Sequence, residues 1–410
     1  MERWKINLYI LWVTQVLSLM SFGLFAPYIP LYLRELGMTD PDGVNLWTGL
    51  LSFTPAAAMV ISSPLWGVMS DRFGKKMMLV RAMACATAII AGMAFVTNHW
   101  QLLILRALQG FFTGTVTASM AFVSTYTPEN RISYALGLLS SSNFIGYSIG
   151  PVVGGLFVET LGLRPCFLSA AVSMAAGLVL AVVCLKEEPV LTASSAASGS
   201  EPSEKKRASG QKPDYKRLLS LSIVLCLLML FTTRMIRSLL GPYMTLFVEE
   251  LLGTTQGAAS WTGIINGVVC IVSAAATLTL VRLGDRHSKM KLLALMTLFT
   301  LPFALFSALA STLLVFLFAF TLFNFFSGAL EPLLTSGASE NAPPEMRGTL
   351  FGIVGMVNNA GFMLAPMLGS YISIRFSLQG ILFLIPAFTA LQLGISLIAV
   401  KKEKAFTNRP

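Results

Sequence analysis

Long runs of apolar residues, separated by short polar segments, follow one another from the start of the chain to its end. Each run is long enough to cross the roughly 30 Å hydrocarbon core of a bilayer as an α-helix. Pro and Gly occur inside several runs, which a membrane bundle tolerates because neighbouring helices satisfy the freed backbone groups. The pattern predicts an all-α membrane protein with twelve transmembrane helices, at residues 7–33, 45–69, 77–96, 100–125, 133–158, 165–185, 218–247, 258–281, 290–310, 312–335, 348–373 and 378–400.

Short motifs recur along the chain at an offset of roughly 215 residues, which is the mark of an internal repeat. Pro27-Tyr28 returns as Pro242-Tyr243, and Trp47-Thr48-Gly49 returns as Trp261-Thr262-Gly263. The Pro-Glu-x-Arg that begins at Pro128 returns at Pro344. The repeat predicts two pseudo-symmetric six-helix bundles with the same topology.

The break between the sixth and seventh runs differs in composition from the rest of the chain. Residues 189–216 are rich in Ser, Ala, Pro, Glu and Lys, a composition that cannot bury enough apolar surface to fold. We therefore expect an N-terminal bundle at 1–186, a cytoplasmic linker at 187–216, a C-terminal bundle at 217–402 and a cytoplasmic tail at 403–410.

Composition supports this reading and fixes the orientation. Of the 410 residues, 55% are hydrophobic and only 12% are charged, which excludes an ordinary water-soluble protein. The net charge of +10 does not indicate nucleic-acid binding, because most Lys and Arg lie in the loops on one side of the predicted membrane. Cytoplasmic loops carry this excess of positive charge, so both termini are predicted to be cytoplasmic.

The chain offers little for a metal, redox or enzymatic site. Its five Cys lie in apolar runs without paired spacing and are interpreted as small packing residues. The two His lie in loops on opposite sides, and no span holds a pair of carboxylates. We expect no metal, no cofactor other than a proton, and no enzyme activity.

Three motifs in the first half carry polar or helix-bending residues at defined spacing. Between the second and third spans, charged residues stand at a helix end, where they can pair and meet a helix dipole. An Arg lies inside the fourth span, and glycines with one proline line the fifth. The residues are Gly67, Asp71, Arg72, Gly74 and Lys75 in the loop, with a degenerate second copy at Asp285 and Arg286; Arg106 in the fourth span; and Gly146, Gly150, Pro151, Gly154 and Gly155 in the fifth.

Together with the repeat, these motifs resemble the major facilitator superfamily and, within it, the drug:proton antiporter group of bacterial multidrug exporters. The resemblance covers nearly the whole chain and implies a monomer in the bacterial inner membrane. It implies that Asp71 latches the cytoplasmic face, that Arg106 takes part in proton coupling, and that the glycine-rich fifth helix marks an antiporter. The alternatives are a polar loop, an Arg that snorkels to the outer interface, and ordinary helix packing.

Glu331 is the one acidic residue placed deep within a span, and an intramembrane carboxylate is a functional-site hypothesis by default. Burial favours its neutral form, so it is the first candidate for the proton carrier. The alternative is a structural pair with an Arg.

Arg234 and Arg237 lie three residues apart and therefore on one face of the seventh helix. With Arg106 they would give a cavity more positive charge than Glu331 offsets, which favours an anionic or zwitterionic substrate. Alternatively, the two pair with Glu249, Glu250 or lipid headgroups near the outer surface.

Other polar residues of the spans are candidates to line the cavity or to bond across helices. They are Asn143, Asn266, Asn324 and Asn358, with Tyr28, Tyr147 and Tyr243. The sequence also departs from the group it resembles: the first helix has Gln15 but no acidic residue, and Phe320 stands where a second copy of Arg106 would fall.

The sequence thus predicts a secondary exporter that moves small amphipathic molecules by alternating access in exchange for protons. Its partners are the substrate, protons and membrane lipids, and no nucleic acid. The alternatives within transport are an exporter of an anionic metabolite such as a siderophore, a flippase of an anionic lipid, and a proton-coupled uptake symporter. A receptor that binds without transport is the alternative from another class.

Overall fold

The computed structural model describes residues 2–128, 131–187, 221–284, 288–340 and 346–407. Throughout these ranges the regular structure is helical, and no strand occurs in them. The predicted linker at 187–216 falls almost entirely outside the described residues, as do Asp285 and Arg286.

The helices follow the predicted spans closely, with ends that extend past the apolar runs. In chain order they are α1 Arg3–Phe25, η1 Ala26–Tyr28, α2 Ile29–Glu35, α3 Pro41–Phe73, α4 Lys75–Met93, α5 His99–Phe112, α6 Thr115–Tyr126, α7 Ile132–Leu161, α8 Leu163–Cys184, α9 Leu221–Leu239, η4 Gly241–Tyr243, α10 Met244–Leu252, α11 Ala258–Gly284, α12 Lys289–Ala308, α13 Leu313–Gly328, α14 Leu330–Glu340, α15 Arg347–Arg375 and α16 Leu378–Thr407.

Four of the predicted spans are divided into shorter helices. Pro27 and Pro242 lie in the first turns of η1 and η4, where a missing N–H is tolerated but a continuous helix is not. Gly114, with φ of +129°, separates α5 from α6 in a backbone conformation that favours glycine. A shorter break at Ala329 separates α13 from α14.

Eleven segments of the described chain are long and apolar enough to cross a membrane. The predicted span at 100–125 is not among them because the break at Gly114 divides it into two short helices. The structure thus supports an all-α membrane protein, with one predicted span formed from two pieces.

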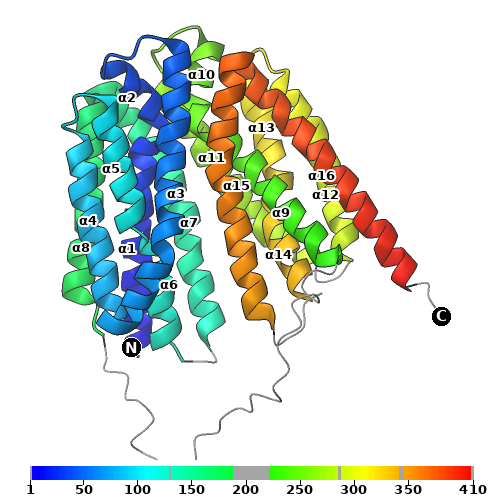
Figure 1. Ribbon diagram of the computed structural model, residues 1–410, viewed down its shortest axis with the longest axis horizontal. Helices are drawn as coiled ribbons and strands as arrows, with labels where there is room; N and C mark the ends of the chain where they lie inside the picture. Colours follow the sequence, from blue (N-terminus) through cyan, green and yellow to red (C-terminus); the bar gives the residue numbers. More distant parts are fainter. Residues whose placement is uncertain (1, 129–130, 188–220, 285–287, 341–345, 408–410) are drawn as a thin grey trace, which may run out of the picture.

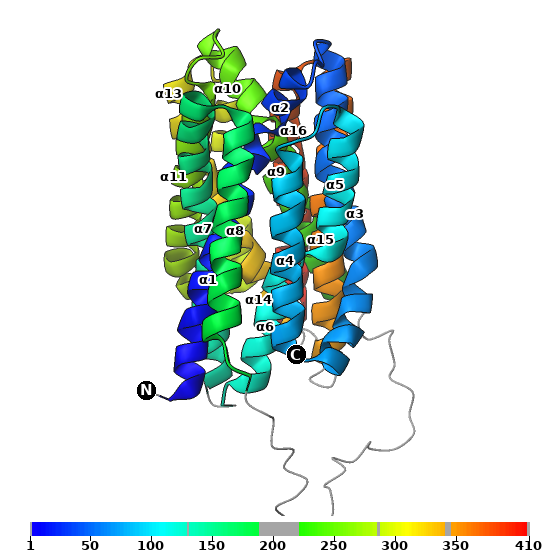
Figure 2. The ribbon, with the colours of Figure 1, turned by 90° about the vertical axis from the view of Figure 1, so that its left-hand side faces the viewer.

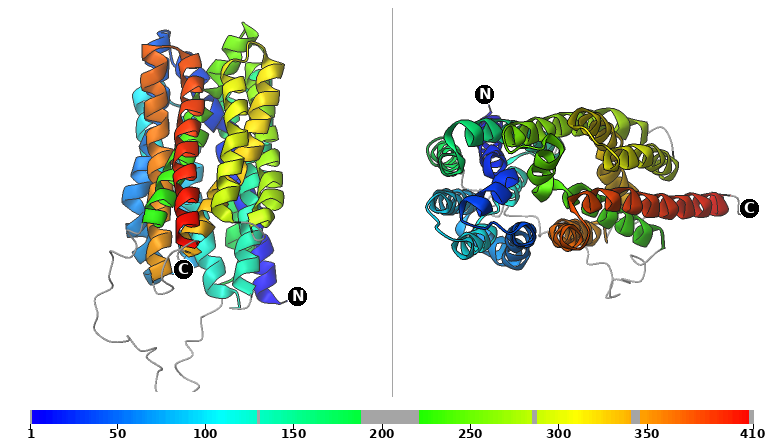
Figure 3. Two further views of the ribbon diagram at one scale, coloured as in Figure 1. Left: turned by 90° about the vertical axis from the view of Figure 1, so that its right-hand side faces the viewer. Right: turned by 90° about the horizontal axis from the view of Figure 1, so that it is seen from above.

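The long helices run roughly side by side, with α2 and α10 at the upper end and both chain termini toward the lower end as drawn in Figure 1. Figure 2 shows the same arrangement from the side of α7 and α8. One buried apolar core is built from residues of α1 to α8 and two others come almost entirely from α9 to α16. Viewed from above, the two sets of helices lie beside each other (Figure 3).

Two long helix pairs join these two sets. Helix α7 packs along α11, and α3 packs along α15. Because each pair combines one helix from either side, the position of these contacts along the helices decides where the interior is closed.

Candidate functional site

Tyr28 and Tyr243, the repeated Tyr residues, make equivalent bonds at the upper end. The Tyr28 hydroxyl donates to the carbonyl oxygens of Pro151 at 2.5 Å and Ala259 at 3.3 Å. The Tyr243 hydroxyl lies 2.7 Å from the carbonyl of Pro366 and 3.4 Å from that of Asn45. Each Tyr therefore ties its own set of helices to the other set.

Glycines of the repeated Trp-Thr-Gly motif allow the same close approach. A Cβ atom on Gly49 would lie 2.7 Å from the Cβ of Ser370 and 2.9 Å from the Tyr243 hydroxyl. A Cβ atom on Gly263 would overlap the carbonyl of Pro151. We call this group of contacts the upper seam; its residues are Tyr28, Asn45, Gly49, Pro151, Tyr243, Ala259, Gly263 and Pro366.

Charged residues add two further links across the upper seam. Arg34 Nη1 lies 2.7 Å from both carboxylate oxygens of Glu249, and these two residues are 215 positions apart. Arg34 and Glu249 thus occupy equivalent positions of the repeat and carry opposite charges. Glu159 accepts a hydrogen bond of 2.9 Å from the backbone N–H of Ser260 and one of 2.5 Å from its hydroxyl.

The lower parts of the same helices do not approach one another in this way. A Cβ atom on Gly67 of α3, Gly137 of α7 or Gly352 of α15 would meet no atom within 4 Å. Among the described residues, the hydrogen bonds that join the two sets reach from the upper end only to the level of Ser148 and Tyr147 near the middle of α7. The seam is therefore closed above and is not continued below.

The glycines of α7 are divided between two neighbours. A Cβ atom on Gly146 would lie 2.6 Å from the Cβ of Leu19. Gly150 and Gly154 likewise press on the backbone of α1. Gly155 faces the other way, where a Cβ atom would lie 2.5 Å from the carbonyl oxygen of Ala259 in α11. The motif therefore packs α7 against its own set of helices and against the opposite one.

Below the upper seam, Glu331 lies within a small group of polar side chains. Its Oε2 atom is 3.2 Å from Arg234 Nη1, and its Oε1 atom accepts a hydrogen bond of 3.3 Å from the Asn358 amide. The Glu331 side chain is 28% exposed and that of Arg234 is 36% exposed, so this is a half-buried pair. We call Arg234, Glu331 and Asn358 the charged cluster.

The cluster decides between two of the expectations for Arg234. Arg234 pairs with Glu331, whereas Glu249 at the upper end pairs with Arg34. The expected alternative of a pair between Arg234 and Glu249 is therefore wrong. The Arg234 Nε atom and the Asn358 carbonyl oxygen are buried without a hydrogen-bond partner, so the cluster retains one free donor and one free acceptor.

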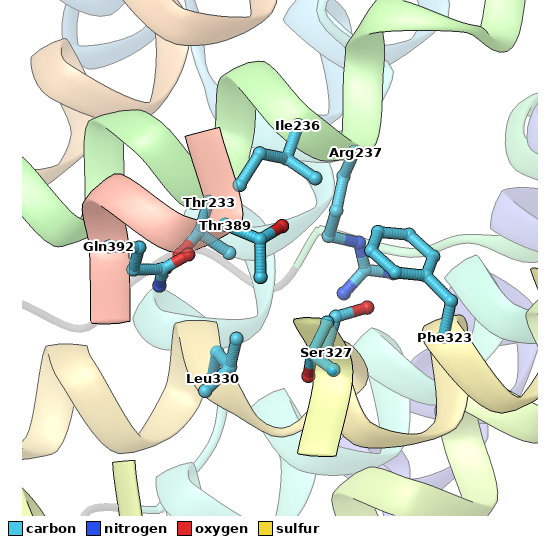
Figure 4. A pocket seen from close by; sticks show the side chains of 9 residues that line it. Thr233, Ile236, Arg237, Phe323, Ser327, Leu330, Thr389 and Gln392 are labelled. Carbon is cyan, nitrogen blue, oxygen red and sulfur yellow. Dashed lines mark hydrogen bonds between the residues drawn. The ribbon is translucent and has the colours of Figure 1, made fainter. Parts of the chain in front are cut away.

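Arg237 lies one turn further along α9 and does not join the cluster by a hydrogen bond. Its nearest polar contact is the Ser273 hydroxyl at 3.5 Å, the outer limit for such a bond. Its guanidinium points toward Ser327 and Phe323 at a small cavity (Figure 4). The cavity lining is completed by Thr233, Ile236, Thr300, Leu330, Thr389 and Gln392.

Arg106 is held in a different part of the structure. Its Nε donates to the carbonyl oxygen of Leu51 at 2.9 Å, and its Nη1 donates to Gln109 at 2.7 Å. The residue is only 9% exposed, so it does not reach the outer interface by snorkelling. Its hydrogen bonds stay within α3 and α5 and do not bring it to Glu331.

The remaining cavity candidates are dispersed. Asn266 and Asn324 donate to carbonyls of their own helices, at Thr262 and Phe320. Asn143 is half-buried in α7, and Tyr147 is exposed within electrostatic range of Arg234. Of the predicted Asn residues only Asn358 contacts Glu331, while Tyr28 and Tyr243 belong to the upper seam.

At the lower end, the loop between α3 and α4 is held by a residue that the sequence analysis did not select. Glu187 Oε1 accepts hydrogen bonds from the backbone N–H of Lys75 at 2.9 Å and from the Tyr126 hydroxyl at 2.8 Å. Gly74, with φ of +92°, brings the backbone against this carboxylate. Glu187 thus binds at the N-terminus of α4, as helix dipoles favour. The side chain of Asp71 lies outside the described residues, and Arg72 is exposed.

A second residue near this loop was not singled out from the sequence. Arg81, within the predicted span at 77–96, lies in α4, where its guanidinium carbon is 3.4 Å from the centroid of a Trp66 ring. Neither Glu187 nor Arg81 carries a motif signal. Each is identified only when α3, α4 and α8 are brought together in space.

Comparisons with known proteins agree with this architecture. The profile of the Major Facilitator Superfamily matches residues 11–232 and 226–409. The chain is 31% identical over 398 residues to the multidrug resistance protein MdtG of Rahnella sp. (strain Y9602), covering 96% of this chain and 93% of that protein. It is 32% identical over 384 residues to a multidrug resistance efflux pump PmrA homologue of Lactococcus lactis, covering 92% of each.

Solved structures with low sequence identity share the fold. An inward-facing, unoccupied bacterial homologue of the human lysosomal transporter Spinster superposes with a TM-score of 0.77 at 12% identity, covering 98% of this chain and 97% of the other. The nucleoside transporter NupG gives a TM-score of 0.72 at 14% identity, covering 95% and 99%. This chain therefore belongs to the Major Facilitator Superfamily, whose members are transporters and not enzymes.

Proposed function

We propose that this protein is a secondary active exporter that moves small amphipathic molecules out of a bacterial cell in exchange for protons. The relatives that match almost its full length carry the names of multidrug resistance proteins. The observation that carries the coupling step is the charged cluster, in which Glu331 is held by Arg234 and Asn358 inside a membrane-spanning region.

The proposed architecture is two six-helix bundles, α1 to α8 and α9 to α16, with both termini in the cytoplasm. Lys75, Lys76, Lys289 and Lys291 all stand at the lower end, and the positive-inside rule assigns that end to the cytoplasm. In this orientation the upper seam closes the outer face, so the described state is inward-facing. Alternating access would break the upper seam and bring the lower ends of the bundles together.

Glu331 would exchange partners during this cycle. While Glu331 is ionised, Arg234 and Asn358 stabilise its charge. Protonation removes the ion pair and frees the Arg234 guanidinium for another ligand. Coupling would follow because proton and substrate then compete for the same side chains.

A second candidate is a dedicated exporter of an anionic metabolite or an anionic lipid. It is favoured by the charge of the interior of α9 to α16, where Glu331 pairs with Arg234 and lies within charge range of a second guanidinium, that of Arg237. Arg forks match carboxylate and phosphate groups, so an anion would offset the surplus charge.

Purified protein in liposomes tests the proposal directly. With an imposed pH gradient, an exporter of this kind drives substrate across the membrane and dissipates the gradient as it does so. The substrates compared should include lipophilic cations, carboxylates and phosphate esters. Binding without flux of any of them, or flux that is indifferent to the pH gradient, would contradict proton-coupled export.

A further inference from the structure

Two hydrogen-bond donors, Arg237 and Ser327, line the small cavity in α9 to α16. Arg237 presents five N–H groups in a planar fork and has no acceptor lone pair. Among the described residues its hydrogen bond goes to the Ser273 hydroxyl at 3.5 Å, and it makes no ion pair, although Glu331 lies within charge range. Figure 4 shows its guanidinium beside the cavity, facing Ser327.

Ser327 adds a donor on the opposite wall. The residue is 2% exposed, and its hydroxyl is buried with no hydrogen-bond partner in the described structure. Figure 4 shows Ser327 facing the Arg237 guanidinium across the cavity. A buried hydroxyl without a partner is costly, so a ligand that accepts from it would be stabilised.

The other polar side chains of the lining are uncharged, and the donors among them bond to protein groups. The hydroxyls of Thr300 and Thr389 donate to backbone carbonyls of their own helices at 2.7 Å. Gln392 donates to the Thr233 hydroxyl at 2.8 Å, and Thr233 donates to a backbone carbonyl. The lining contains no Asp or Glu. Glu331, which follows Leu330 in α14, lies within charge range of Arg237 but is bonded to Arg234 and Asn358.

The charge balance of the region points the same way. Glu331 accepts from Arg234 and Asn358, one partner for each of its oxygens, and makes no hydrogen bond to Arg237. One positive charge in this part of the bundle therefore lacks a paired negative charge among the described residues. An uncompensated charge at membrane depth is unfavourable, and an anion would relieve it.

The volume limits what can bind. The cavity measures about 10 Å³, which is room for roughly one water-sized body. We propose that the cavity formed by Arg237, Ser327 and their neighbours binds one acceptor atom of a compact monovalent anion: a halide ion or one oxygen of a carboxylate. The two sources share the same chemistry, a small acceptor with a single negative charge.

Binding of an anion to this cavity is separate from transport and can be measured at equilibrium, without a gradient. Full-length protein in detergent is kept in sodium isethionate, whose anion is too bulky for the cavity, and titrated with sodium chloride at constant ionic strength. A saturable rise in Tm is expected, because a ligand that binds the folded state stabilises it. A parallel titration with sodium formate tests the carboxylate source.

Variants locate the binding. Arg237→Gln should weaken the response at least about tenfold in half-maximal concentration, and Ser327→Ala about fivefold. Ser142→Ala is the matched control, because Ser142 is 0% exposed and its hydroxyl donates to the carbonyl of Leu139 in α7, a helix that contributes no residue to the cavity lining. Diffraction from crystals soaked in bromide gives a readout on the unaltered protein, with an anomalous peak expected between Arg237 and Ser327.

The outcomes separate cleanly. Saturation by chloride assigns the site to a free halide, and saturation by formate alone assigns it to a carboxylate. No saturation with either anion and no bromide peak would mean that only water occupies the cavity, and the proposal would be wrong. An equal response in Arg237→Gln would also overturn it. None of these results decides whether the protein exports its substrate, so the two proposals can fail separately.

Discussion

The upper seam and the charged cluster differ in how they use the internal repeat: the seam contacts occur in both halves, and the cluster occurs in only one. In the upper seam, Tyr28 and Tyr243 each bond a proline carbonyl 123 residues further along the chain, and each also reaches the opposite bundle. In the charged cluster, Arg234 and Glu331 have no charged counterparts: the equivalent of Arg234 in the first half is Leu19. The contacts that close the upper end therefore occur twice, once in each half of the repeat, whereas the charged cluster occurs once.

This difference assigns separate tasks to the two regions. Equivalent bonds on both sides of a seam can form and break together when two bundles rock about a common axis. A proton carrier needs no such symmetry, because one carboxylate is sufficient for one exchange. Substitutions in the upper seam should therefore alter the equilibrium between the closed and the open seam. Substitutions in the charged cluster should alter the coupling of substrate transport to protons.

The largest effect is expected in the cluster. Glu331→Gln keeps the shape of the side chain but cannot be ionised, so gradient-driven transport should fall to the level of empty liposomes. Substrate counterflow without a gradient should persist, because it needs no proton exchange. Glu340→Gln at the exposed lower end is the control, since Glu340 pairs there with Lys289. Full coupled transport in Glu331→Gln would place the proton carrier elsewhere.

The next effect is expected where α7 meets α11. Gly155→Val would force a side chain against the carbonyl of Ala259 and should destabilise the closed seam by about 1–3 kcal/mol. Spin labels on the loops before α3 and α11 should then report a larger distance across the outer face. Gly137→Val in the same helix is the matched control, because a Cβ atom there meets nothing within 4 Å.

Removal of the two seam hydroxyls tests the symmetry itself. Tyr28→Phe and Tyr243→Phe should each weaken the closed state by about 1 kcal/mol, because each removes the hydrogen bond that crosses the seam, at 3.3 Å to Ala259 or 3.4 Å to Asn45. The same spin-label distances give both values. If one substitution opens the seam and the other has no effect, the two sides do not act as equivalents.

The smallest effect is expected at the ion pair on the outer surface. Arg34 is 41% exposed, and solvent screening limits such pairs to about 0–1 kcal/mol. Glu249→Gln should shift the seam slightly, and less so at high salt. The exchanged pair Arg34→Glu with Glu249→Arg should restore the original distance. If the change in spin-label distance does not depend on salt concentration, packing and not charge would explain it.

The sequence could predict the helices because membrane spans must be long and apolar, and the repeat could predict which residues are equivalent. The sequence contains Gly114 but did not predict that the fourth span is interrupted there. The interruption depends on the positive φ of Gly114, which the sequence does not reveal. Glu331 could be found because a carboxylate is rare in a span. Its partner Asn358 could not, because Asn143, Asn266 and Asn324 looked alike until the helices were packed.

The same limit applies to residues that act at contacts between distant segments. Arg237 was grouped with Arg234 because both lie on one helical face. In the structure Arg234 pairs with Glu331, whereas Arg237, one turn further along, lies at the cavity and bonds to Ser273. Glu187 gave no motif at all and is recognised only by its bonds to α4 and Tyr126.

The pair between Arg34 and Glu249 bears on how such a chain could have arisen. If two identical six-helix proteins had assembled about a two-fold axis, this position would have brought two like charges together and pushed the outer ends apart. In a single chain that carries both copies, each copy can change separately, so one can present a cation and the other an anion. Two identical subunits encoded by one gene could not form this attractive pair between equivalent positions.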